Sequence, residues 1–194
     1  MTNAGHYLPV LLVAVLASFA AADIASAERK PQPGKPAEVA TRGQREAKDI
    51  TYGNWKKLCF KAGGAPLLCR TSITGNFATG QLAVRMDLIE RQGDKGARLQ
   101  LFVPVGMYLQ HPIKLSVDQG GVYRVPYSWC LANACIAADV AAPRLIKEME
   151  SGTKLVLEVV DSNLQELTTS LPLSQFASVH GSAPAQILEQ DIEE

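Results

Sequence analysis

The sequence is poor in motifs that are typical of enzymes. It contains no Gly-x-Ser-x-Gly elbow, no His-Glu-x-x-His pair and no glycine-rich loop with a phosphate-binding lysine. It also lacks a basic excess, because 19 lysines and arginines balance 19 aspartates and glutamates. A nucleic-acid-binding protein needs a basic face to engage phosphates, so that class is disfavoured. We therefore expect a non-enzymatic protein with no cofactor, no metal and no nucleic-acid partner.

Long apolar runs are scarce, and the only one lies near the start of the chain. Residues 8–22 form a run of 15 residues without a charged side chain, and Ala25-Ser26-Ala27 follows. A transmembrane helix needs roughly 20 residues, so the run fits the core of a secretory signal better. We expect a signal peptide over residues 1–27, with an uncleaved membrane anchor as the alternative. The mature protein would be exported to the periplasm, the outer membrane or the cell exterior, without a transmembrane helix.

The remainder divides by composition into three parts. Residues 28–49 are rich in proline and charge and have no aromatic side chain, which predicts a flexible linker. Residues 50–181 have the apolar patterning of a single folded domain. Residues 182–194 end in uncompensated acidic residues and predict a frayed tail.

Most of the folded part reads as short strands separated by turns. Apolar side chains alternate with polar ones in each segment, as in half-buried strands. The clearest segments are "QLAVRMDLI", "RLQLFVP", "IKLSVD", "VYRVPYSW", "TKLVLEVV" and "LQELTTSLPL". Short strands at this spacing indicate an all-β antiparallel sandwich or barrel.

One helix and a second helical turn are expected within this pattern. Pro143 suits a first helical turn, Leu145 and Met149 lie about one turn apart, and Gly152 is a stop signal. A second short helical turn is expected near residues 174–180.

The four cysteines are the candidate site residues: Cys59, Cys69, Cys130 and Cys135. An even number of cysteines in an exported chain predicts disulfides. We favour Cys59–Cys69 and Cys130–Cys135 because each pair brackets a short segment expected to turn, and a crossed pairing is the alternative. In the chain-entropy model the two closed loops contribute about 2.8 and about 2.2 kcal/mol.

Metal and redox roles for the cysteines are weaker alternatives. Structural zinc usually uses cysteines two to four residues apart, often with histidine, and the spacing here does not match. Dithiol oxidoreductases normally use Cys-x-x-Cys at the start of a helix, whereas "CLANAC" follows a strand-like segment. A thiol pair at Cys130 and Cys135 is kept as a competing hypothesis.

Other polar and aromatic residues are expected to be structural. His111 and His180 could join a catalytic triad only through the fold, and a surface or turn role is expected for His111. Three carboxylates are expected on exposed strands or turns: Asp87, Glu90 and Asp118. Three aromatic residues are expected in the core or against a disulfide: Trp55, Phe102 and Trp129.

The order of these features resembles the invasion-associated locus B family of exported bacterial proteins. The matching pieces are "YGNWKKLC", Cys69, "PVGMYL", "IKLSVD", "VPYSWCLANACIA" and "LPLSQF". The resemblance implies a signal peptide, an immunoglobulin-like β-sandwich and local disulfides, and it associates the chain with host-cell invasion.

Two functional hypotheses follow. The first is an exported, non-enzymatic binding or envelope-associated protein that meets an envelope or host-surface protein through loops near the disulfides. The second is an envelope enzyme, either a thiol oxidoreductase or a hydrolase. A third possibility is a chaperone-like partner or an inhibitor of another exported protein.

Overall fold

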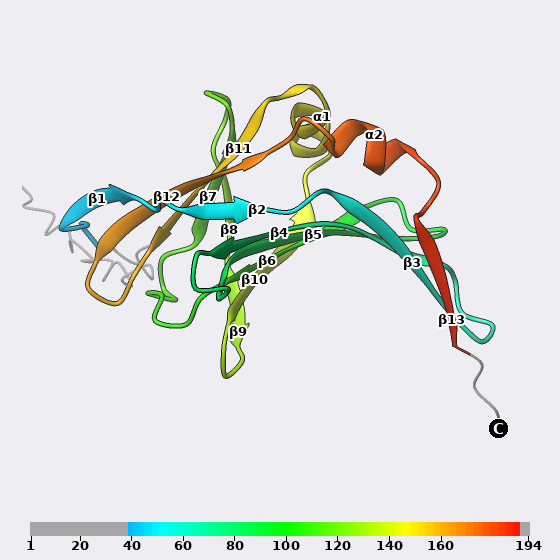
Figure 1. Cartoon of the computed structure of the whole chain (residues 1–194), viewed down its shortest axis with the longest axis horizontal. Coiled ribbons are helices and arrows are strands. Elements are labelled where there is room, and N and C mark those ends of the chain that lie inside the picture. Colours follow the sequence, from blue (N-terminus) through cyan, green and yellow to red (C-terminus); the bar gives the residue numbers. More distant parts are fainter. Residues whose placement is uncertain (1–38, 191–194) are drawn as a thin grey trace, which may run out of the picture. The chain divides into compact units, whose positions relative to one another are not determined.

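The computed structural model describes residues 39–190, which form a β-sandwich of two sheets (Figure 1). The expected signal peptide lies outside the described residues. The five-stranded sheet has the order β1 (Gly43–Glu46), β12 (Gln165–Pro172), β11 (Lys154–Val160), β7 (Ile113–Val117) and β8 (Tyr123–Val125). The eight-stranded sheet has the order β13 (Gln186–Gln190), β3 (Lys56–Ala62), β4 (Leu68–Phe77), β5 (Leu82–Arg91), β6 (Ala97–Val103), β10 (Cys135–Ala141) and β9 (Tyr127–Cys130), and β2 (Ile50–Tyr52) pairs with β4.

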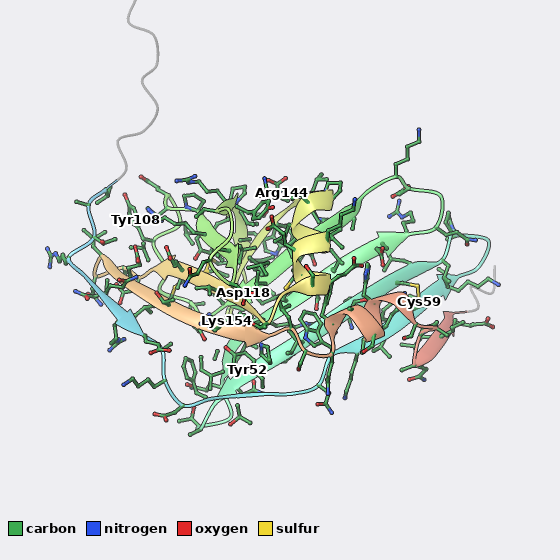
Figure 2. All side chains as sticks on the ribbon, turned by 90° about the horizontal axis from the view of Figure 1, so that it is seen from above. Tyr52, Cys59, Tyr108, Asp118, Arg144 and Lys154 are labelled. Carbon is green, nitrogen blue, oxygen red and sulfur yellow. A yellow bond between two sulfur atoms is a disulfide. The ribbon has the colours of Figure 1, made fainter. Side chains whose placement is uncertain are left out.

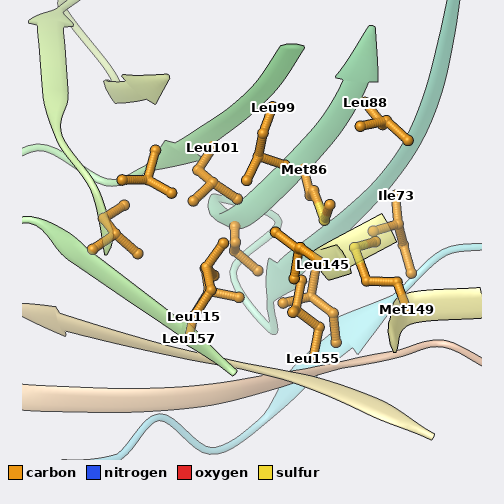
Figure 3. Packing of buried hydrophobic residues seen from close by; sticks show 14 of the residues in the cluster. Ile73, Met86, Leu88, Leu99, Leu101, Leu115, Leu145, Met149, Leu155 and Leu157 are labelled. Carbon is orange, nitrogen blue, oxygen red and sulfur yellow. The ribbon is translucent and has the colours of Figure 1, made fainter. Parts of the chain in front are cut away.

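The core lies between the two sheets and follows the two-residue period of the strands (Figure 3). In β5, for example, Val84, Met86 and Leu88 are buried against the other sheet. Their counterparts in the five-stranded sheet include Leu115 and Leu157. Each such side chain contributes about 1.5–3 kcal/mol when fully buried. The expected all-β sandwich with two short helices and two local disulfides is confirmed.

The two helices lie on the same side of the eight-stranded sheet as the five-stranded sheet (Figure 1). Helix α1 (Pro143–Ser151) begins at the expected proline and buries Leu145 and Met149, and the N–H of Gly152 donates to the Glu148 carbonyl at 2.8 Å. Helix α2 (Phe176–Gly181) buries Phe176, whose ring meets Trp55 edge-on at 4.8 Å. The helices therefore extend the cover over the inner face of the larger sheet.

The segment "VYRVPYSW" was expected to be one strand but forms two. β8 belongs to the five-stranded sheet and β9 to the eight-stranded sheet, with Pro126 between them. Proline has no N–H to donate to a ladder, so the chain can change sheets there. The Pro126 carbonyl accepts a hydrogen bond from the Ala138 N–H at 3.1 Å, which fixes the crossing to β10.

Two further strands lie where the sequence predicted a linker and a tail. β1 pairs in parallel with β12, and β13 pairs in parallel with β3, so each sheet gains one parallel edge strand. All four residues of β1 are exposed. A strand without a buried face has no apolar alternation, so the sequence pattern does not predict it.

Candidate functional site

The Cys59–Cys69 disulfide joins two directly opposed residues of β3 and β4, with the Cα atoms 4.0 Å apart. The expected pairing is confirmed. Cys59 is fully buried, and β3 is flanked on its other side by β13. This hairpin is therefore an internal part of the sheet and not a free edge.

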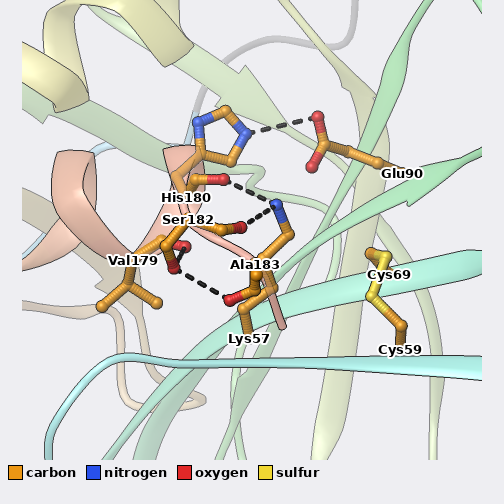
Figure 4. The surroundings of a disulfide bond; sticks show 8 residues. All are labelled: Lys57, Cys59, Cys69, Glu90, Val179, His180, Ser182 and Ala183. Carbon is orange, nitrogen blue, oxygen red and sulfur yellow. Dashed lines mark hydrogen bonds and ion pairs between the residues drawn. A yellow bond between two sulfur atoms is a disulfide. The ribbon is translucent and has the colours of Figure 1, made fainter. Parts of the chain in front are cut away.

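Helix α2 holds the Cys59–Cys69 hairpin from the inner side (Figure 4). The Nζ of Lys57 donates to the carbonyls of His180 and Ser182 at 2.7 and 3.2 Å. These carbonyls lie at the C-terminal end of α2, where a cation is favourable. Trp55, just before β3, donates from Nε1 to the Pro172 carbonyl at 2.8 Å, and it is buried as expected.

His180 lies between two carboxylates from different elements. Its Nδ1 is 3.0 Å from Glu150 Oε1 on α1, and its Nε2 is 3.2 Å from Glu90 Oε1 on β5. The ring also stacks on Phe176 with the centroids 5.2 Å apart. His180 thus connects α2 to Glu150 on α1 and to Glu90 on β5, and we call this arrangement the His180 clamp.

The Cys130–Cys135 disulfide also joins directly opposed residues, here on β9 and β10, with the Cα atoms 3.9 Å apart. The pairing again agrees with the sequence prediction. The Leu131 N–H donates to the Ala134 carbonyl at 2.7 Å and closes the turn inside the disulfide. Cys130 is exposed while Cys135 is 3% exposed. Neither cysteine begins a helix, unlike the Cys-x-x-Cys pair of dithiol oxidoreductases.

The tip of this hairpin carries exposed apolar side chains. Trp129 is 45% exposed and Leu131 is 52% exposed. Trp129 was expected in the core or against a disulfide, and the core alternative is wrong. Its partner in the ladder is Ile136, which points away from the five-stranded sheet, and β9 is the last strand of its sheet. The sequence did not identify Leu131 as a candidate binding residue. The only signal for it was an apolar residue at a position expected to be a turn.

The three expected carboxylates do not converge. Asp87 is buried at 1% exposure, which corrects its expected exposure, because the Arg85 guanidinium donates two hydrogen bonds of 2.8 Å to it. Glu90 lies on the opposite face of β5, beside His180. Asp118 is in a turn, as expected, and its φ of 50° is a left-handed conformation.

Asp118 joins the end of β7 to the start of β11 (Figure 2). The backbone N–H groups of Thr153 and Lys154 each donate to its carboxylate at 3.1 Å, and the Thr153 hydroxyl donates a further bond. The bond from the Thr153 hydroxyl makes the largest contribution to lowering the pKa of Asp118, and the backbone bonds lower it further. The carboxylate thus acts as a turn clamp.

The remaining expected residues are also structural. His111 is 6% exposed, not on the surface, and its N–H donates to the Tyr108 carbonyl at 3.1 Å in a turn. Phe102 is half-buried on the face of the larger sheet that points away from the smaller one, where the Arg85 guanidinium lies 5.1 Å from its ring centroid. It is therefore neither a core residue nor an open stacking platform.

One small cavity lies between the two sheets. A mainly apolar cavity of about 60 Å³ lies among Val84, Val103, Met107 and Leu157. Cofactor and ligand pockets usually measure about 300–1,000 Å³. Across residues 39–190, no cluster of histidine, cysteine and carboxylate side chains could hold a metal ion. No helix in the described part of the chain is long and apolar enough to cross a membrane.

The fold and its four cysteines define a small β-sandwich protein clipped by two local disulfides. The family model described as "Invasion associated locus B (IalB) protein" matches residues 55–184, so the chain belongs to this family. A crystal structure of invasion associated protein B from Bartonella henselae is similar, with 22% identity and a TM-score of 0.60 over 67% of this chain and 90% of that chain. At this identity the match supports the fold. No curated protein matches the chain.

Proposed function

We propose that this chain is an exported, non-enzymatic binding protein of the cell envelope, and that it meets a protein partner through the β9–β10 hairpin. The observation that carries the proposal is the exposure of Trp129 and Leu131 beside Cys130, on a hairpin closed by a disulfide. Tryptophan is enriched among the residues that dominate binding energy. A turn held by a disulfide presents its side chains at a low entropic cost on binding.

Site-specific photo-cross-linking in intact cells tests this proposal. A cross-linkable residue at position 131 is expected to capture one defined partner, and Trp129→Ser should abolish the capture. Val122 lies before β8 and is 56% exposed, so a cross-linker there is the matched control. Equal capture of the partner from positions 122 and 131 would show that the β9–β10 hairpin is not the specific binding site.

The finer proposal is a role in contact with host cells. It rests on the family description, which names invasion, and on the same exposed hairpin. A deletion strain should enter host cells less well than its parent, and the wild-type gene should restore entry while a Trp129→Ser/Leu131→Ser gene should not. Unchanged entry by the deletion strain would refute the role in invasion and leave the binding proposal standing.

A thiol oxidoreductase using Cys130 and Cys135 is the second candidate, because Cys130 is exposed to an attacking thiol. Alkylation of native protein before and after reduction separates the two functions. The binding proposal predicts that both disulfides are fully closed in the cell. A partly reduced Cys130–Cys135 pair beside a closed Cys59–Cys69 pair would favour the enzyme.

A further inference from the structure

The eight-stranded sheet gathers arginine residues on its outer face, defined as the face turned away from the five-stranded sheet. The ladder places Arg70 on β4 and Arg98 on β6 on either side of Ile89 on β5. Arg91 lies two residues beyond Ile89 on the same face and pairs with Leu68. We call Arg70, Arg91 and Arg98 the arginine patch.

The arginine patch has no anion among the described residues. Arg85, on the same face, is matched by Asp87, but none of the three patch residues forms an ion pair within residues 39–190. Arg70 is held 5.2 Å from the Phe60 ring centroid, and its buried Nε has no hydrogen-bond partner. The guanidinium groups of the patch therefore have no anionic partner in the described part of the chain, and a planar guanidinium can bind an external phosphate through two N–H donors.

Apolar side chains share the surface with these cations. Arg91 and Arg98 line a shallow depression of about 330 Å³ together with Leu68, Ile89 and Val140, and Asp94 is the only acidic residue of its lining. Val140 is 71% exposed, the largest value among the exposed apolar side chains of the described part. The patch therefore offers both positive charge and uncovered apolar surface.

We propose that the arginine patch docks the protein onto an anionic phospholipid surface. Guanidinium groups match phosphate oxygens in a two-pronged geometry. Long cationic side chains set among exposed apolar groups are typical of surfaces that lie in the headgroup region of a membrane. A free phosphate or an anionic glycan would use the charges but would leave Val140 and its apolar neighbours uncovered. The three arginines lie on β4, β5 and β6, whereas Val140 lies on β10, so the surface shares only β10 with the β9–β10 hairpin. The proposal does not depend on the proposed partner.

Vesicle sedimentation tests the proposal with protein purified from the envelope in its native processed form. The protein should bind phosphatidylcholine vesicles that contain phosphatidylglycerol, and it should not bind vesicles of phosphatidylcholine alone. Binding should weaken as salt is added. Because each cation near an anionic surface contributes about fivefold in affinity, Arg70→Gln/Arg91→Gln/Arg98→Gln should weaken binding about 100-fold.

The matched control removes three positive charges from other faces, as Arg45→Gln/Arg124→Gln/Lys147→Gln, and should bind nearly as well as the wild type. Circular dichroism and disulfide mapping confirm that both variants are folded. The corresponding triple lysine variant retains the charge and should stay within about fivefold of the wild type. Equal losses in the glutamine and control variants, or equal binding to both kinds of vesicle, would overturn the proposal. Patch-dependent binding of heparin, polyglutamate or inorganic phosphate without vesicle binding would also overturn it.

Discussion

The two disulfide hairpins are nearly identical in their local covalent geometry and opposite in their surroundings. In each, the cysteines are directly opposed on antiparallel strands, with the Cα atoms 4.0 and 3.9 Å apart. The Cys59–Cys69 hairpin lies within the sheet and is held by α2, whereas the Cys130–Cys135 hairpin forms the sheet edge and exposes Trp129.

The comparison shows that a disulfide does not determine the role of a hairpin. Inside the sheet the link adds to contacts that already hold the strands, including the Lys57 bonds to α2. At the edge, the same kind of link substitutes for a neighbouring strand and leaves side chains free to meet a partner. We therefore expect changes near the first hairpin to affect stability and changes near the second to affect binding.

The largest expected difference comes from removing one aromatic residue beside each hairpin, Phe176 on α2 and Trp129 on β9. Phe176 is completely buried against Trp55, so Phe176→Ala should lower the free energy of unfolding by about 3–5 kcal/mol. Trp129 is 45% exposed, so Trp129→Ala should lower it by clearly less than Phe176→Ala does. Urea unfolding measures both values. Comparable losses of unfolding free energy in the two variants would contradict the distinction between a hairpin that is buried and a hairpin that exposes its side chains.

Removing each disulfide is expected to give the next largest effects. In the chain-entropy model Cys59→Ala/Cys69→Ala loses about 2.8 kcal/mol and Cys130→Ala/Cys135→Ala about 2.2 kcal/mol. The first variant should lose somewhat more than this, because Cys59 is fully buried and its truncation leaves a cavity.

The order of reduction in the folded protein provides an independent check on the same pairs. Cys130 is exposed and Cys59 is not, so mild reductant should open Cys130–Cys135 first. Mass analysis after timed alkylation reads the order. Opening of Cys59–Cys69 first would show that the inner hairpin is more accessible than its burial indicates.

The sequence predicted well what depends on local pattern. The central strands, α1 and both disulfides follow from alternation, from Pro143 and Gly152, and from short cysteine spacings. These signals lie within a few residues of the feature that they predict.

Features that depend on strand order were missed. Trp129 is exposed because β9 is an edge strand, and β1 and β13 are strands only because β12 and β3 lie beside them. The arginine patch and the His180 clamp unite residues far apart in the chain, such as Glu90 and His180. Periodicity contains no information on these neighbours.

A smaller effect is expected from releasing the inner hairpin from α2. Lys57→Met removes the bonds to the His180 and Ser182 carbonyls while keeping the apolar stem, and should cost about 1 kcal/mol. Amide exchange in α2 should also become faster. Lys56→Met is the matched control because the Lys56 side chain is exposed. If both variants are equally stable, the lysine bonds contribute nothing to holding the hairpin.

The smallest expected effect concerns a turn that is clamped by a carboxylate instead of a disulfide. The bonds from Thr153 and Lys154 lower the pKa of Asp118 in the folded protein below its ordinary value of 3.8. Its contribution to stability is therefore complete above that value and is lost as the pH falls through the lower folded pKa. Asp118→Asn preserves the size and tolerates the left-handed backbone, so the wild type should lose more stability than the variant on acidification. Urea unfolding from neutral pH to below 3.8 tests this. If the unfolding free energies of the two proteins change with pH in parallel, the charge of Asp118 does not contribute to stability. Both disulfide hairpins should keep their amide protection over this range, because neither contacts the Asp118 turn through a hydrogen bond or ion pair of the described residues.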